Sequence, residues 1–127
     1  MEQKKCIKIL YVDSEEYNLT AFSAYFRRMD DFEITTSLSI EETLKSDSDF
    51  NVLIIDHAIL KSGEDVVCQM LKNEGANMVK IVVTTYRDIT RLESYLASGE
   101  LYDCLAKPID FECLGRIIEQ AYRSYFK

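Results

Sequence analysis

Four short apolar runs, each followed directly by a polar or charged residue, most constrain the fold of this sequence. The runs are Ile7–Val12, Val52–Ile55, Lys80–Val83 and Leu101–Ala106, and segments long enough for a helix separate them. Short, continuous apolar runs are typical of strands buried on both faces of a parallel sheet. Their alternation with helix-length segments predicts an α/β fold with helices on both faces of the sheet.

A further strand is predicted at Phe32–Ser37, where β-branched residues alternate with polar ones. Helical patterns occupy five segments. The first follows Asp13 and carries an apolar stripe of Leu19, Phe22, Phe26 and Met29. The others are Ile40–Ser46, Gly63–Asn73, Ile89–Ser98, which Gly99 ends, and the last segment from Asp110. The sequence therefore predicts one doubly wound parallel sheet of five strands with five helices. Right-handed crossovers favour the flavodoxin-like strand order 2-1-3-4-5, which places the first and third strands side by side.

The residues that follow the apolar runs are Asp13, Asp56, Thr84 and Lys107. In an open α/β sheet, ligands bind outside the carboxyl ends of the strands, where the strand order reverses. We therefore expect two carboxylates, a hydroxyl and an ammonium group to meet at one edge of the sheet. That set suits a phosphoryl group held together with a divalent metal.

Length and composition narrow the functional class. The chain has 127 residues, which suits one domain over residues 1–127. Its net charge of −7 argues against direct contact with nucleic acid. Since the chain has neither an apolar run long enough to span a membrane nor a secretory h-region, no membrane role and a cytoplasmic location are expected. The four cysteines have no CxxC spacing, which favours reduced structural thiols.

From end to end the sequence resembles the receiver domain of two-component response regulators. The segments that carry the resemblance are ILYVDSEEYNL, VLIID, VVTTYRD and SGELYDCLAKPID, in the family's order and spacing. The resemblance implies a phosphorelay function, with a histidine kinase or a phosphotransfer protein as the phosphoryl donor.

Three residues receive roles in phosphoryl transfer from this resemblance. Asp56 is the expected phospho-acceptor, because a carboxylate can attack a phosphoryl group and form an acyl phosphate. Thr84 is expected to donate its hydroxyl to a phosphoryl oxygen, and Lys107 to pair with the phosphoryl charge. The family's peptide bond between Lys107 and Pro108 is cis. The structural alternatives are a turn-capping Asp56, a β-branched strand residue at Thr84 and a solvated lysine.

The resemblance also implies a Mg²⁺ cofactor. Its ligands would be Asp13, Asp56 and the backbone carbonyl of Ala58, with Ser14 or Glu15 as a further candidate. Magnesium prefers oxygen ligands and usually keeps several waters. Ser14 stands where the family usually has a second acidic residue, so weaker Mg²⁺ binding is expected. Asp13 can also cap the following helix, and both roles are compatible.

The segment after Asp56 departs from the family pattern. Ile59-Leu60 replaces a Met-Pro pair, and Gly63 comes one residue early, so a shorter loop is expected. His57 follows the acceptor directly. Because successive strand residues point to opposite faces, its side chain is expected to point away from the site, as a surface or loop histidine.

The family often has a Tyr or Phe three residues before its lysine, and here that position is Cys104. Coupling between an aromatic side chain and Thr84 would therefore need Tyr102 or Tyr86 instead. The face formed by the helix at Ile89–Ser98, the strand at Leu101–Ala106 and the last helix is expected to bind a downstream partner or a second copy of the chain.

The sequence is compatible with three functional hypotheses. The first is a phosphorylatable receiver that switches this face. The second is a degenerate receiver, which binds a partner without phosphorylation; Ser14, the short loop and Cys104 favour it. The third, an aspartate-nucleophile phosphatase, needs a second Asp where Ala58 stands, so an enzyme is not expected. A flavin-binding flavodoxin is excluded by the acidic DSEEYN loop.

Overall fold

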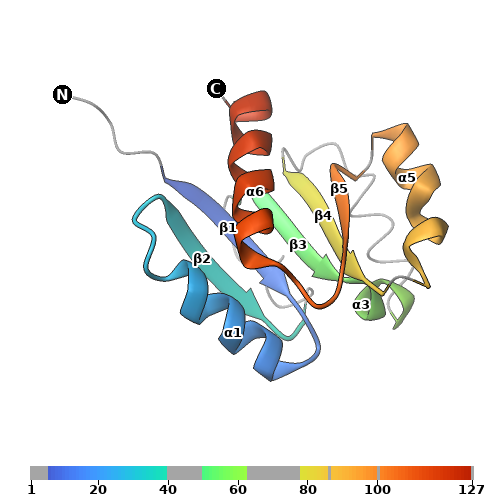
Figure 1. The fold of residues 1–127 in the computed structure, drawn as a ribbon, viewed down its shortest axis with the longest axis horizontal. Coiled ribbons are helices and arrows are strands. Elements are labelled where there is room, and N and C mark those ends of the chain that lie inside the picture. Colours follow the sequence, from blue (N-terminus) through green and yellow to red (C-terminus); the bar gives the residue numbers. More distant parts are fainter. Residues whose placement is uncertain (1–5, 40–49, 63–77, 86, 100, 127) are drawn as a thin grey trace.

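The computed structural model describes residues 6–39, 50–62, 78–85, 87–99 and 101–126. Its centre is a five-stranded parallel sheet in the order β2-β1-β3-β4-β5 (Figure 1). The strands are β1 (Ile7–Val12), β2 (Phe32–Ser37), β3 (Val52–Asp56), β4 (Val79–Thr84) and β5 (Asp103–Ala106). The helical elements are α1 (Glu16–Phe26), α3 (His57–Ser62), the 3₁₀ turn η1 (Ile89–Leu92), α5 (Glu93–Ser98) and α6 (Phe111–Phe126).

The helices cover the two faces of the sheet in separate groups. Helices α1 and α6 pack on one face, and α3, η1 and α5 pack on the other (Figure 1). Strand side chains alternate between these two layers: Ile9 and Ile54 face α1 and α6, whereas Leu10 and Leu53 face the other group. The central strands are therefore apolar on both faces, which explains their continuous runs in the sequence.

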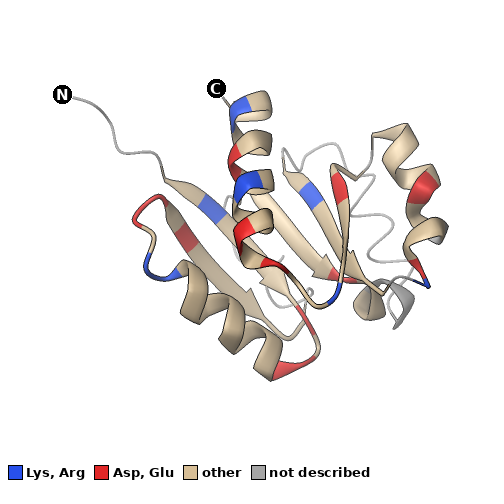
Figure 2. Cartoon of the chain, viewed as in Figure 1, with Lys and Arg blue, Asp and Glu red and all other residues tan. Residues whose placement is uncertain are grey.

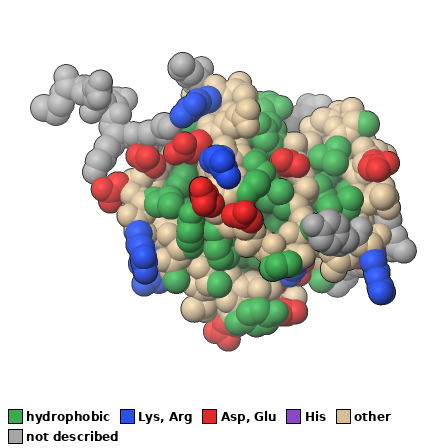
Figure 3. All heavy atoms as spheres, viewed as in Figure 1, with side chains coloured by type: hydrophobic (Ala, Val, Ile, Leu, Met, Phe, Trp, Pro, Cys, Tyr) green, Lys and Arg blue, Asp and Glu red, His purple; other side chains and the backbone are tan. Residues whose placement is uncertain are grey.

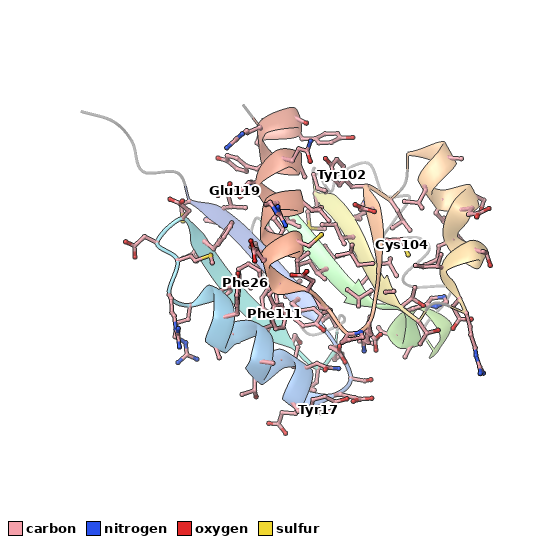
Figure 4. The ribbon with its side chains drawn as sticks, viewed as in Figure 1. Tyr17, Phe26, Tyr102, Cys104, Phe111 and Glu119 are labelled. Carbon is pink, nitrogen blue, oxygen red and sulfur yellow. The ribbon has the colours of Figure 1, made fainter. Side chains whose placement is uncertain are left out.

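Aromatic rings fix α1 against α6 and the sheet. Phe22 and Phe26 are fully buried, and Phe111 at the start of α6 contacts both rings. Burying a phenylalanine side chain contributes roughly 1.5–3 kcal/mol. Figure 4 shows Phe26 and Phe111 between the two helices, and Figure 3 shows apolar side chains along their junction. This packing fixes the second half of α1 against α6 and the sheet.

The sheet confirms the predicted strand number and order. Among the described residues there are four α-helices rather than five, and the predicted helices at Ile40–Ser46 and Gly63–Asn73 lie outside that part of the chain. Helix α3 begins at His57, within the segment predicted as a loop. The helix predicted at Ile89–Ser98 is split into η1 and α5, and Gly99 ends it with a positive φ of 84°, as glycine permits.

No helix in the described part of the chain is long and apolar enough to cross a membrane.

Candidate phosphoryl-transfer site

The carboxyl ends of three strands bring two carboxylates and one ammonium group together. Lys107 Nζ lies 3.2 Å from Asp56 Oδ1 and 3.4 Å from Asp13 Oδ2. Asp13 directly follows β1 and Asp56 ends the neighbouring β3, so the strand order alone places them at one edge. Figure 2 shows acidic residues where β1 and β3 end and a basic residue just after β5. The peptide bond between Lys107 and Pro108 is cis, as the resemblance implied.

Asp13 is held by several donors that the sequence analysis did not identify. The Tyr11 hydroxyl donates to Asp13 Oδ2 at 2.6 Å, and Asn18 Nδ2 donates to the same oxygen at 3.1 Å. The backbone N–H of Glu15 donates to Asp13 Oδ1 at 2.9 Å, the pattern of an Asx turn. A spacing of two residues puts Tyr11 and Asp13 on one face of the strand, which is the signal that could have revealed this contact.

Burial and neighbouring charge act on these groups in opposite directions. Burial alone lowers the pKa of Lys107, but Asp56 and Asp13 together outweigh it, so the Lys107 pKa is raised and the ammonium form is favoured. For Tyr11, burial and then the hydrogen bond to Asp13 raise the phenol pKa far above its ordinary value. Tyr11 therefore stays a neutral donor to a carboxylate at neutral pH.

The charges of this cluster suit a divalent cation. Two ionised carboxylates and one ammonium leave one excess negative charge, and both carboxylates are buried. Buried charges need compensation, and Mg²⁺ is commonly held by one or two carboxylates plus waters. Among the described residues no group of three or more His, Cys, Asp or Glu side chains could hold a metal ion. Asp13 and Asp56 are the two carboxylates that could hold a Mg²⁺ ion here, with waters as its other ligands.

The other proposed metal ligands lie around this pair. Ser14 and Glu15 are exposed. The Glu15 carboxylate accepts a hydrogen bond from Tyr17, which raises the pKa of that exposed phenol. Ala58 lies in the first turn of α3, where a carbonyl is directed along the helix toward the N–H four residues later. A metal bond from this carbonyl would compete with that helical hydrogen bond.

Thr84 and His57 meet at the end of β4, which corrects the expectation for His57. His57 is buried, and its Nδ1 lies 2.9 Å from Thr84 Oγ1. The prediction of an outward-pointing histidine was wrong because it assumed that strand alternation continues past Asp56. Helix α3 begins at His57 instead, and the helical turn directs the imidazole toward β4. Thr84, only 2% exposed, is the buried one of the two adjacent threonines.

Thr85 and Asp88 border this contact. Thr85 is exposed, and its hydroxyl donates to Asp88 Oδ2 at 3.3 Å. The same carboxylate oxygen lies 3.8 Å from His57 Nδ1. The loop after β4 therefore carries a negative charge toward the imidazole.

Cys104, which stands in place of the family's aromatic residue, lies on β5, and Tyr102, one of the two tyrosines considered instead, lies just before it (Figure 4). Cys104 packs in the layer with η1 and α5, and burial raises the pKa of its thiol to about 11. The Tyr102 N–H donates to the Lys80 carbonyl, whereas the Lys107 N–H donates to the Thr84 carbonyl. Four strand residues separate these two levels, about 13 Å. Tyr102 therefore lies beside the beginning of β4, too far from Thr84 at its end to contact it. Tyr86 lies outside the described residues.

Comparison with known proteins supports the fold. No protein-family model matches the sequence, and no curated protein matches it. Among solved structures, the chain is similar to an adenylate cyclase from Rhodopirellula baltica, with a TM-score of 0.79 and 24% sequence identity. The match covers 93% of this chain and 88% of that chain.

Two further similar structures are receiver domains. The signal receiver domain of an HD domain-containing protein from Pseudomonas fluorescens Pf-5 has a TM-score of 0.80 and 18% identity, covering 95% of this chain and 98% of that one. The BeF₃-activated receiver domain of DrrB, a response regulator from Thermotoga maritima, has a TM-score of 0.66 and 18% identity, covering 93% and 98%. The chain therefore has the fold of a response regulator receiver domain.

Proposed function

We propose that this chain is a receiver domain that accepts a phosphoryl group on Asp56 from a histidine kinase or a phosphotransfer protein. The observation that carries the proposal is the position of Lys107, whose ammonium group lies within 3.4 Å of both Asp13 and Asp56. A cation held at the rim of two buried carboxylates can receive the additional negative charge that phosphorylation brings.

The proposed reaction uses residues at the edge of the sheet. An Asp56 carboxylate oxygen attacks the phosphorus of a phosphohistidine, the P–N bond breaks, and its electron pair stays on the departing imidazole, which takes a proton from solvent. The product on this chain is an acyl phosphate. Lys107 pairs with its charge, and Thr84 donates a hydrogen bond to a phosphoryl oxygen. Mg²⁺, when held by Asp13 and Asp56, would supply further charge neutralisation.

The output of this reaction is a change of a protein-binding face, not turnover of a substrate, so no enzymatic activity is proposed. The face consists of α5, β5 and α6, and β5 is an edge strand of the sheet. Phosphorylation would bias a two-state element that includes Thr84 and Lys107, at the ends of β4 and β5. A cytoplasmic location and no direct contact with nucleic acid belong to the same proposal.

Intact mass spectrometry after incubation with acetyl phosphate and Mg²⁺ tests the proposal. The wild-type chain is expected to gain the mass of one phosphoryl group, and Asp56→Asn is expected to lose this gain while keeping the fold. The matched control is Asp31→Asn, the same chemical change at an exposed acid between α1 and β2. No mass gain in the wild type, or a gain that persists in Asp56→Asn, would contradict the proposal.

A degenerate receiver is the second candidate, and one observation favours it. Asp13 Oδ2 already accepts from Tyr11 and Asn18 and lies near Lys107. An oxygen with these neighbours is a poorer metal ligand than one facing water. If the wild type gains no phosphoryl group yet binds a partner through α5, β5 and α6, this second function replaces the first.

A further inference from the structure

His57 places a buried imidazole at the edge of this site. It directly follows the proposed acceptor Asp56, it is buried, and its Nδ1 lies 2.9 Å from Thr84 Oγ1. Thr84 follows Val83, which is the register partner of Asp56 in the β3–β4 pairing. The imidazole therefore contacts the hydroxyl at the strand end next to the acceptor.

The direction of this hydrogen bond decides what Thr84 can do. A hydroxyl has one proton to donate and can also accept. The Asp88 carboxylate oxygen, 3.8 Å from the same Nδ1, favours a proton on that nitrogen rather than a lone pair. With the proton on Nδ1, the imidazole donates and Thr84 Oγ1 accepts. The hydroxyl proton of Thr84 then remains for another acceptor.

We propose that His57 is a positioning residue that holds the Thr84 hydroxyl as a donor toward a phosphoryl oxygen on Asp56. The inference rests on the proposed function and adds a residue to it. The bond from Nδ1 selects one rotamer of the threonine before the phosphoryl group arrives. A hydroxyl that accepts a hydrogen bond also donates a stronger one, because the bonds polarise each other.

Binding of beryllium fluoride with Mg²⁺, as a mimic of the phosphoryl group, measures the effect. His57→Phe keeps a ring of similar size and removes the donor, and it should weaken binding about 2- to 10-fold, the range of one net hydrogen bond. His57→Asn keeps an N–H donor near the place of Nδ1 and should restore most of the affinity. In a Thr84→Val background, His57→Phe should cause no further loss.

The ring nitrogens give a readout that does not depend on phosphoryl chemistry. The chain has one histidine, so its imidazole gives the only such signals in a ¹⁵N NMR spectrum. We expect the neutral ring to carry its proton on Nδ1, and Thr84→Val to shift that signal. A proton on Nε2 alone would overturn the inference, because Thr84 would then donate its hydroxyl proton to Nδ1 of His57 and could not donate it to a phosphoryl oxygen.

The binding results separate this inference from the function on which it rests. If beryllium fluoride binds the wild type and His57→Phe equally well, or binds the variant more tightly, His57 has no positioning role and the proposed function stands. If His57→Phe loses as much affinity in the Thr84→Val background, the effect is general damage and the inference is overturned. If the wild type binds no beryllium fluoride, the proposed function and this inference fall together.

Discussion

Removing one oxygen atom from Tyr11 tests how the buried carboxylate of Asp13 is stabilised. The Tyr11 ring is fully buried and packs on Phe22, with ring centroids 4.7 Å apart. Tyr11→Phe keeps this packing and deletes the hydroxyl that donates to Asp13 at 2.6 Å. The change is therefore close to a pure loss of one hydrogen bond to a charged group.

The expected cost follows from that bond. Hydrogen bonds to charged groups contribute about 1.5–3 kcal/mol, and we expect the free energy of unfolding to fall by that amount. For a chain of 127 residues this corresponds to a decrease in Tm of roughly 6–11 °C. Urea unfolding followed by circular dichroism measures it. The control is Tyr25→Phe at a half-buried tyrosine, for which a change within about 0.5 kcal/mol is expected.

A second substitution isolates the charge. In an Asp13→Asn background the hydroxyl faces a neutral amide, so Tyr11→Phe should cost only about 0.5–1.5 kcal/mol. The reasoning would be refuted if Tyr11→Phe cost no more than Tyr25→Phe, or if its cost were the same in both backgrounds.

The raised pKa of Tyr11 adds a pH dependence. The phenol ionises near its ordinary value of 10.0 in the unfolded chain and at higher pH in the folded one. Its contribution to stability is therefore complete below about pH 10 and is lost as pH rises further, because the unfolded state releases its proton first. The pKa of Lys107 is also raised above its ordinary value of 10.5, so the contribution of Lys107 to stability is likewise lost as pH rises above that value. Tyr11→Phe should thus show a smaller, but not absent, alkaline decrease in stability.

Two further predictions concern the metal and the binding face. Ser14→Asp should tighten Mg²⁺ binding by restoring a carboxylate beside Asp13, and equal affinities in a titration would show that the missing charge is already replaced. The face of α5, β5 and α6 is expected to self-associate weakly, since half-buried aromatic residues such as Tyr95 and Tyr102 are enriched at interfaces. Sedimentation at rising concentration, with and without beryllium fluoride, should show a dimer that Tyr95→Ala and Tyr102→Ala weaken; a strict monomer in all cases would contradict this.

The sheet could be predicted from the sequence because its signal is local and repeated. Each buried strand, such as Val52–Asp56, is apolar on both faces, and the polar residue at its end marks the edge of the sheet. Once the strand order is chosen, Asp13 and Asp56 must be neighbours. Lys107 was expected at the same edge because β5 also ends there, but β4 lies between β5 and β3, so the strand order alone does not give its contact with both carboxylates.

The contacts that surround these residues could not be predicted in the same way. Helix α3 begins at His57, directly after the last residue of β3 and without a loop between them, so strand alternation was extended one residue too far. The hydrogen bond from Tyr11 to Asp13 was missed because a tyrosine within an apolar strand was taken only as an apolar ring of the core. Its hydroxyl acts only because the carboxylate two residues later lies on the same face of β1.

The donors around Asp13 bear directly on the replacement of the second acidic residue by Ser14. A second carboxylate would add negative charge next to Asp13 and require a cation to balance it. Here Tyr11 and Asn18 supply two neutral donors to the one carboxylate, and Lys107 supplies a positive charge that Asp56 shares. Compared with a site that carries a second carboxylate, this cluster is closer to electrical balance, so we expect the unphosphorylated chain to bind Mg²⁺ more weakly. In the proposed phosphorylated state the excess negative charge would be larger, so we expect that state to depend more strongly on Mg²⁺ than the resting one.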